Sequence, residues 1–271
     1  MDEPRVTYRT VDEGRIAIVS LNRPRYRNAL SLQTMQELDE VFQRAAKAPE
    51  VRVAILRAEG PAFSAGHDLG SPDVAGRTPS ENRTRGMYEH TWDLDIDHYL
   101  RFRSLPIPTI AAVHGQCILA GWMLASSMDV IFASEDAEFL MSDIEYFSMP
   151  WDIGVRKTKG IVFENRFLTA PEVEAMGFVY QVVPAADLEE TVLEYARRVA
   201  EQDKFRLRMM KLSLNQMQDM MGFSTHIIGH HTGWAVSRSG SLPPERDKTA
   251  SRQHGIVAHA RTAPPRGPAK A

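Results

Sequence analysis

One stretch of the chain, residues 106–139, constrains the fold more than any other. It begins with a β-rich apolar run at residues 109–113, which passes through a glycine turn into a segment of small residues. A helical segment over about residues 119–127 then leads to a second apolar strand at residues 130–133. The order strand, glycine turn, helix start and strand leaves free backbone N–H groups facing the place where a negative charge can develop. The pattern predicts an anion-stabilising turn that the rest of the chain supports.

Around this stretch, apolar periodicity alternates between the strand and the helix repeat. An alternating strand pattern occurs at residues 15–21 and a buried-strand pattern at residues 51–56, and an amphipathic helix capped by Ser31 lies between them at residues 32–47. The last part of the chain has only helical patterns, over about residues 204–221 and 224–238, and the first of these is rich in methionine. This order predicts an α/β core followed by an α-helical C-terminal region. We expect three parts: a core over residues 1–200, a helical region over 201–260 and a disordered, proline-rich tail over 261–271.

Composition excludes several classes of protein. With 43% apolar and 25% charged residues among 271, the chain has the make-up of an ordinary soluble globular protein. A formal net charge of -3 argues against a nucleic-acid partner, because binding to phosphate backbones needs a basic surface. The single cysteine, Cys117, forbids an internal disulfide and a cysteine-based zinc site. No secretory segment and no membrane-spanning apolar run is seen, so we expect a cytoplasmic protein without a membrane partner.

An ordered set of short motifs carries a family resemblance. The motifs are residues 63–69 (FSAGHDL), 110–115 (IAAVHG) and 129–133 (DVIFA), supported by 28–30 (NAL) upstream and 175–179 (AMGFV) downstream. Together they resemble the crotonase superfamily, which contains enoyl-CoA hydratases and isomerases. The resemblance implies a ββα spiral core, a C-terminal helical region used for trimerisation, and a homotrimer or dimer of trimers.

The resemblance also implies how a substrate would be held. In that family the carbonyl of an acyl-CoA thioester lies between two backbone N–H donors, which by position would be those of His67 and Ala120. The chemistry is consistent, because a thioester enolate places negative charge on one oxygen and two fixed amides stabilise it without reorganising. Coenzyme A is then part of the substrate, and no separate cofactor is expected. The His67 imidazole is expected to have a surface or packing role, and Asp68 is expected to cap a helix rather than catalyse.

The acid–base residues depart from the family pattern. Hydratases of the family have a glutamate at the position of Met123, which cannot move a proton, and a second acid at the position of Asp143. One carboxylate can still carry a proton between the α and γ carbons, so the residues favour double-bond isomerisation, with Asp143 as the base. Hydration would need a substitute acid, for which Asp152 and His114 are the candidates. Glu145 is closer in sequence, but it is expected to point elsewhere if this stretch is extended.

Further residues are predicted to contact the substrate. Arg25, Arg27 and Lys211 would meet the phosphates of coenzyme A, although a solvated face explains them equally well. Trp122 and Trp151 could form walls of an acyl pocket, with core packing as the alternative. The predicted substrate-binding set is completed by residues of the two motif loops: Ala65, Asp68, Leu69, Gly121 and Met123. The histidines have no spacing that indicates a metal site, so none is predicted.

Alternative functions remain open at this point. The same oxyanion site could serve thioester hydrolysis or decarboxylation. Met123 also fits a member that kept the fold, binds acyl-CoA and lost its chemistry. RNA binding is a third option, which the net charge disfavours. The acyl chain cannot be read from the sequence.

Overall fold

The structure is a computed structural model that describes residues 3–74, 83–142, 144–239, 256–258 and 260–262. Asp143, the predicted base, lies outside the described residues. Of the predicted tail, residues 261 and 262 are helical, and residues 263–271 also lie outside the described residues.

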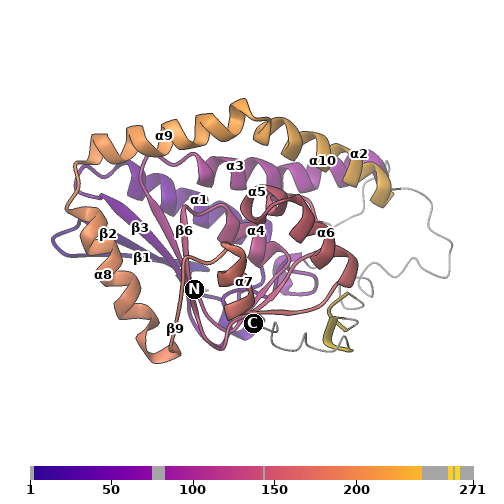
Figure 1. The fold of residues 1–271 in the computed structure, drawn as a ribbon, viewed down its shortest axis with the longest axis horizontal. Coiled ribbons are helices and arrows are strands. Elements are labelled where there is room, and N and C mark those ends of the chain that lie inside the picture. The colour runs from indigo at the N-terminus through magenta and orange to yellow at the C-terminus, as the bar shows by residue number, and fades with distance from the viewer. Residues whose placement is uncertain (1–2, 75–82, 143, 240–255, 259, 263–271) are drawn as a thin grey trace.

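Two sheets form the centre of the molecule (Figure 1). The larger has six strands in the order β1-β2-β3-β4-β6-β9, with β1 antiparallel to β2 and the other neighbours parallel. Its strands are β1 (Val6–Val11), β2 (Ile16–Leu21), β3 (Val53–Ala58), β4 (Thr109–Val113), β6 (Val130–Ser134) and β9 (Gln181–Val183). The smaller sheet has the order β5-β7-β8 and consists of β5 (Gln116–Ile118), β7 (Glu138–Leu140) and β8 (Leu168–Thr169).

Helices cover both faces of the large sheet. They are α1 (Leu32–Lys47), α2 (Arg83–Thr91), α3 (Asp97–Arg103), α4 (Ala120–Ser126), α5 (Met149–Ile153), α6 (Val155–Glu164), α7 (Ala170–Met176), α8 (Leu188–Ala200), α9 (Lys204–Met220) and α10 (Phe223–Ser239). A π-helical turn, Trp92–Ile96, joins α2 to α3. As predicted, Ser31 caps α1: its hydroxyl accepts a hydrogen bond from the Thr34 amide at 3.2 Å.

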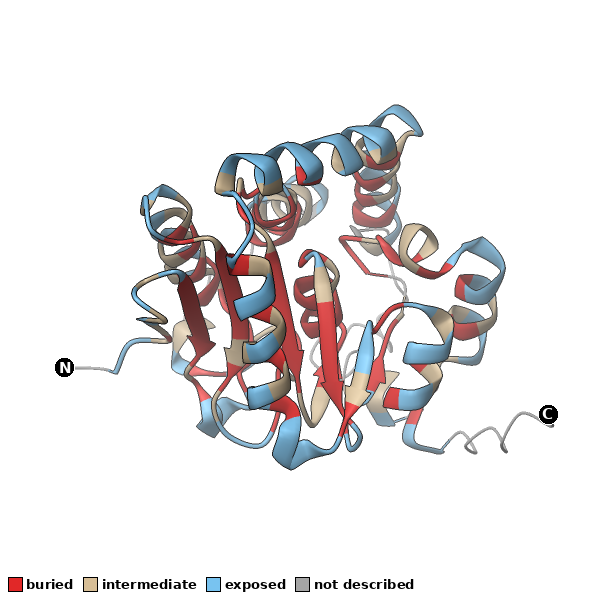
Figure 2. Cartoon of the chain, turned by 60° about the vertical axis from the view of Figure 1, so that its left-hand side comes forward, coloured by how far each residue is buried: buried red, intermediate tan, exposed pale blue. Residues whose placement is uncertain are grey.

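The sheet is buried on both sides, as Figure 2 shows for its central strands. One face packs against α8 through residues such as Ile55 and Ile110, which meet Val192 and Ala196. The other face belongs to the main core, which also contains residues of α1, α3 and α4. Burial on both faces explains why these strands appear in the sequence as continuous apolar runs instead of alternating patterns.

The predicted α/β core with a helical C-terminal region is confirmed, and its two long helices are α9, which is rich in methionine, and α10, which contains none. Figure 1 shows them running end to end along one side of the molecule. Arg103 of α3 donates to the Asn215 carbonyl of α9 at 3.0 Å, and α10 packs against α2. None of the described helices combines the length and the apolar character that crossing a bilayer requires.

Candidate active site

Two loops of the sequence motifs lie against each other through their backbones. The Ser64 amide donates to the Gln116 carbonyl at 2.9 Å, and the Ile118 amide donates to the Ser64 carbonyl at 3.0 Å. Gly66 follows with φ +93°, and a Cβ there would lie 2.9 Å from the Ile118 oxygen and 3.6 Å from the Ala120 nitrogen. Only glycine fits this close approach, because any larger residue would be both strained and in contact with backbone. The FSAGHDL loop is therefore fixed beside the start of α4.

The two amides that the sequence nominated, those of His67 and Ala120, lie on these adjoining loops. Ala120 is the first residue of α4, so its N–H has no partner within the helix. Leu119 before it has φ 48° and ψ −104°, an unusual conformation for a residue with a side chain. Among the described residues neither amide has a hydrogen-bond acceptor. Two donors from adjoining loops are the arrangement that an oxyanion hole needs.

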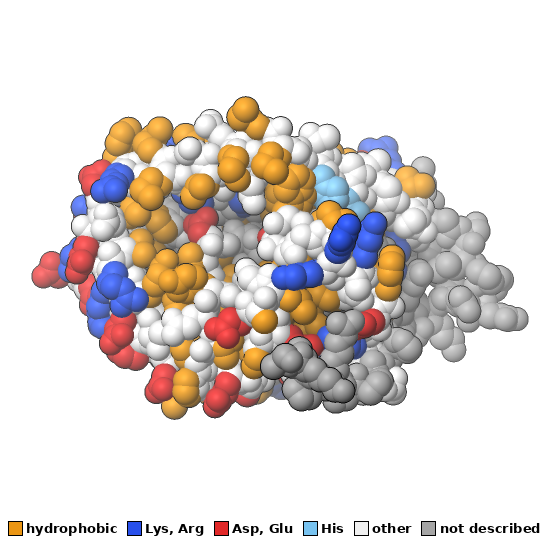
Figure 3. All heavy atoms as spheres, in the orientation of Figure 1, with side chains coloured by type: hydrophobic (Ala, Val, Ile, Leu, Met, Phe, Trp, Pro, Cys, Tyr) orange, Lys and Arg blue, Asp and Glu red, His pale blue; other side chains and the backbone are white. Residues whose placement is uncertain are grey.

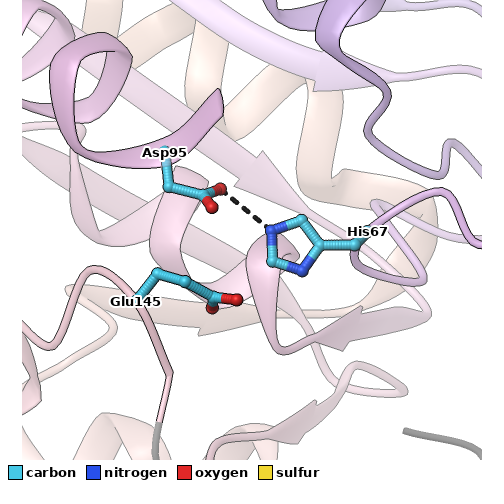
Figure 4. A group of neighbouring side chains, drawn as sticks. All are labelled: His67, Asp95 and Glu145. Carbon is cyan, nitrogen blue, oxygen red and sulfur yellow. Dashed lines mark hydrogen bonds and ion pairs between the residues drawn. The ribbon is translucent and has the colours of Figure 1, made fainter. Parts of the chain in front are cut away.

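The His67 side chain lies in a buried group that the sequence did not predict (Figure 4). Its Nε2 lies 2.9 Å from Oδ1 of Asp95, and the Glu145 carboxylate points toward the same ring. One ligand atom from each of the three residues lies within 4.8 Å of the others. We call His67, Asp95 and Glu145 the acid–histidine cluster.

The expectation for Glu145 was wrong: the chain bends at residues 145 and 146 instead of extending, and Glu145 is only 5% exposed beside His67. Of the two roles expected for the His67 imidazole, at the surface or in packing, the structure excludes the surface, because this side chain is 8% exposed and paired with a carboxylate. Asp95 lies in the π-helical turn, a rare geometry that is frequent at functional sites. The available sequence signal for Asp95 was a carboxylate between two apolar residues of a helical segment.

Charges inside the cluster strongly perturb one another. Burial by itself would lower the pKa of His67, but the carboxylates of Asp95 and Glu145 outweigh it and raise the pKa to about 9. Burial raises the pKa of Glu145 to about 7, and the neighbouring imidazolium opposes the shift. One imidazole nitrogen and two carboxylates are also a donor set that divalent metals accept.

Tyr99 of α3 lies between the cluster and Ala120, the second residue whose amide the sequence nominated. Its hydroxyl donates to the Ala120 carbonyl at 3.3 Å. Burial, followed by the charges of Asp95 and Glu145, raises the pKa of Tyr99 well above its usual value. The cluster thus adjoins both nominated residues: it contains His67 and reaches Ala120 through Tyr99.

The position that holds an acid in hydratases is filled by an apolar side chain. Met123 is completely buried, and its Sδ accepts a hydrogen bond from the Tyr146 amide at 3.2 Å. That contact places the Met123 side chain against the residue that follows Glu145. The structure therefore brings Met123 and Glu145 into the same neighbourhood.

Asp152 and His114, the two candidates for a substitute acid, make contacts outside the cluster. Asp152 lies on α5, where its Oδ2 accepts hydrogen bonds from the hydroxyls of Ser126 at 2.7 Å and Ser148 at 3.0 Å. Burial raises the pKa of Asp152 to about 7 against the effect of these two hydrogen bonds. His114 Nε2 lies 2.8 Å from the Gly60 carbonyl oxygen on the exposed side of its turn.

The predicted substrate-binding residues of the first loop divide into structural and exposed ones. Asp68 is ion-paired with Arg23 at 2.9 Å and accepts from the Ser71 amide at 2.9 Å, so it holds its own loop and caps no α-helix. Ala65 donates its amide to the Arg27 carbonyl at 2.9 Å. The side chains of Arg25, Arg27 and Leu69 are exposed. The loop residues are thus together, with two arginines on the solvent side.

Four other predicted contacts lie in packed surroundings. Lys211 is buried, and its Nζ is engaged by Asp129 at 2.8 Å and by the Ile107 carbonyl at 3.1 Å. Trp122 is fully buried and stacks on Phe178 with ring centroids 4.0 Å apart, which matches core packing. The indole N–H of Trp151 donates to His226 of α10 at 3.0 Å. Gly121 packs on Ser64, whose carbonyl oxygen would lie 2.9 Å from an added Cβ.

Comparison with known proteins now adds to this geometry. Residues 12–226 match the family model for enoyl-CoA hydratase/isomerase. A putative enoyl-CoA hydratase of Mycobacterium tuberculosis, EchA13, is 39% identical over 88% of this chain and 84% of its own. The crystal structure of a probable enoyl-CoA hydratase of Mycobacterium smegmatis is 37% identical, with a TM-score of 0.78 over 84% of this chain and 93% of that one.

A more distant relative bears a different name. A structure described as a monofunctional enoyl-CoA isomerase of M. smegmatis is 27% identical, with a TM-score of 0.63 over 79% of this chain and 94% of that one. The family match covers most of the chain, and its range includes every motif on which the resemblance rested. The chain therefore belongs to the enoyl-CoA hydratase/isomerase family of the crotonase superfamily.

Proposed function

We propose that the chain catalyses proton transfer on an enoyl-CoA thioester through an enolate held by the amides of His67 and Ala120. The observation that carries the proposal is the pair of N–H groups on adjoining loops, neither of which has an acceptor among the described residues. Two such donors stabilise charge on a thioester oxygen, because they are in place before the charge forms. The names of the relatives supply the substrate class.

The remaining roles rest on the sequence resemblance together with exposure. Asp143 is the proposed proton carrier, from its position in the motif pattern. Arg25 and Arg27 are exposed beside the FSAGHDL loop and would meet the phosphates of coenzyme A. Coenzyme A belongs to the substrate, and the reaction written here needs no metal or further cofactor.

The number of acid–base groups decides the product. A single carboxylate suffices to move a proton from the α to the γ carbon, which isomerises the double bond. The absence of an acidic group at Met123 favours this reaction. Hydration is the second candidate, because adding water requires one group to take a proton and another to give one. The burial of Glu145 beside His67 favours this second candidate, because it supplies a further carboxyl group at the site.

The test is deuterium exchange with 2-enoyl-CoA and 3-enoyl-CoA esters in D₂O, followed by mass spectrometry and NMR. We expect deuterium at the α carbon, with double-bond migration from the 3-enoyl ester, and a loss of at least 100-fold in Asp143→Asn, as for a catalytic acid–base group. An alkyl-CoA thioether, which lacks the carbonyl oxygen, is the binding control and should bind more weakly than the ester. Binding of every ester without exchange would contradict the proposal and identify an acyl-CoA-binding protein without turnover.

A further inference from the structure

The starting point is the missing acid at Met123. The Met123 sulfur contacts the Tyr146 amide, so the place of the missing group adjoins the segment that carries Glu145. Glu145 is also two residues from Asp143 in the sequence. Among the described residues, Glu145 is the buried carboxylate that both lies near Met123 and belongs to the cluster containing His67.

The surroundings of Glu145 favour its protonated form. The carboxylates of Asp95 and Glu145 are both buried beside a single imidazole. Burial of Glu145 disfavours its ionised form more strongly than the positive charges of His67 and Arg238 favour it, so the pKa of Glu145 is raised. The titratable or charged groups that face Glu145 come from four elements: His67, Asp95, Tyr99 and Arg238.

We propose that Glu145 is the second acid–base group of this site, positioned by the His67–Asp95 pair, and that it allows the protein to add water to a 2-enoyl-CoA. The inference rests on the proposed function, because it needs the enolate at the two amides. Water oxygen bonds to the β carbon, and its proton passes to the carboxylate already proposed as carrier. The electron pair of the carbon–carbon double bond moves to the thioester oxygen, and the enolate then takes the Glu145 proton at its α carbon. Solvent returns a proton to Glu145 and removes the one from the carrier.

The pKa of Glu145, raised by burial to about 7, supports this role, because an acid with that pKa can both give and take protons at neutral pH. Burial raises the pKa of Asp152 to a similar value. Asp152, however, is hydrogen-bonded to Ser126 of α4 and to Ser148 at the start of α5, and not to His67 or Ala120. Asp95 differs in another way: its Oδ1 pairs with His67, and its Oδ2 is buried with no hydrogen-bond partner among the described residues. Asp95 is therefore a positioning residue, and Glu145 is the group with a proton to exchange.

The experiment compares two rates in Glu145→Gln: hydration of a 2-enoyl-CoA and isomerisation of a 3-enoyl-CoA. We expect the ratio of hydration to isomerisation to fall at least tenfold, because glutamine fills the same space but cannot give a proton. Glu138→Gln is the matched control, since Glu138 is an exposed glutamate seven positions earlier, and its ratio should equal that of the wild type. An unaltered ratio in Glu145→Gln would overturn the inference, whereas absence of both reactions in the wild type would instead contradict the proposed function.

The pH profile separates proton donation from a structural effect. Hydration needs protonated Glu145, so its rate should fall as pH rises through about 7 in the wild type. His67→Gln keeps the backbone amide and removes the imidazolium. Because the imidazolium favours the carboxylate form of Glu145, its removal raises the pKa of Glu145, and the fall in rate should move to higher pH. A fall that stays at the same pH in His67→Gln would contradict the coupling.

A bound metal is the remaining explanation of the same three side chains. Hydration that is lost on dialysis against EDTA and restored by Zn²⁺ would overturn the inference and assign the cluster as a metal site. Hydration that persists after EDTA, with less than one equivalent of metal by elemental analysis, would support Glu145 as a proton-carrying group.

Discussion

Gly66 makes a close backbone contact in the candidate site. Its φ is +93°, and a Cβ would lie 2.9 Å from the Ile118 oxygen. Gly177, at the end of α7, has a similar φ of +86°, but nothing lies within 4 Å of its Cβ position. The two glycines therefore share the backbone requirement and differ only in the close approach.

We predict that Gly66→Ala loses about 2–4 kcal/mol of unfolding free energy, because strain and backbone contact add. It should also lose proton-exchange activity, since the His67 amide would shift. Gly177→Ala should lose about 1 kcal/mol and keep its activity. Urea unfolding and the D₂O exchange assay measure both effects, and equal losses in the two variants would contradict the role of the contact.

At the level of single residues, the sequence predicted that the loops of His67 and Ala120 adjoin, but it did not predict the side-chain cluster. His67 and Ala120 are placed by local motifs in which glycines fix the chain, so their adjacency follows from short stretches. The meeting of His67 with Asp95 and Glu145 depends on a π-helical turn and on a bend at residues 145 and 146. Neither feature has a short-range sequence pattern, so Glu145 was expected to point away.

Between elements, an ion-pair network fastens β1 and α1 to the loop after the FSAGHDL motif. The Asp73 carboxylate is contacted by Arg5 at 2.7 Å, by the Ser31 hydroxyl at 3.0 Å and by Arg23 at 3.1 Å. These contacts, that with Arg5 first, lower the pKa of Asp73 to about 2. Regular elements such as α1 followed from apolar periodicity, but this network joins residues 68 positions apart and could not be predicted.

We predict that Asp73→Asn lowers the free energy of unfolding at pH 7 by about 1–2 kcal/mol, a figure reduced for screening near the surface. The folded pKa lies below the unfolded value of about 3.9, so the stabilisation is present above that pH and is lost as pH falls toward 2. Urea unfolding between pH 7 and 3 should show the two proteins converging. Asp97→Asn, which breaks an exposed pair with Arg101, is the control and should cost less than 0.5 kcal/mol, on the order of other surface pairs. A constant difference at every pH would contradict the charge-based explanation.

For the whole molecule, the outer face of α9 is the most informative surface. Figure 3 shows hydrophobic side chains gathered along this helix. Exposed members are Phe205, Met209, Met210, Leu212, Leu214, Met217 and Met220. Lys211 on the opposite side is buried against Asp129, which fixes the rotation of the helix and leaves the apolar face outside. An apolar face of this extent marks a contact with another protein surface.

We predict self-association through α9, with the homotrimer or dimer of trimers that the family resemblance implies. Leu214→Glu combined with Met217→Glu should shift the mass measured by sedimentation from oligomer to monomer, because charge would be buried without a partner. Phe163→Glu, which changes an exposed aromatic residue of α6, is the control and should leave the mass unaltered. A monomeric wild type at micromolar concentration would contradict the prediction.

The backbone amide and the side chain of His67 have separate roles. Its amide exists whatever side chain the residue carries, so the anion-binding property of that place is encoded by Gly66 and by the unusual backbone of Leu119. The imidazole is thereby left free to take part in another structure, the pairing with Asp95. Substitutions at position 67 can therefore alter the charge beside the two proposed donors while the backbone amide stays in place.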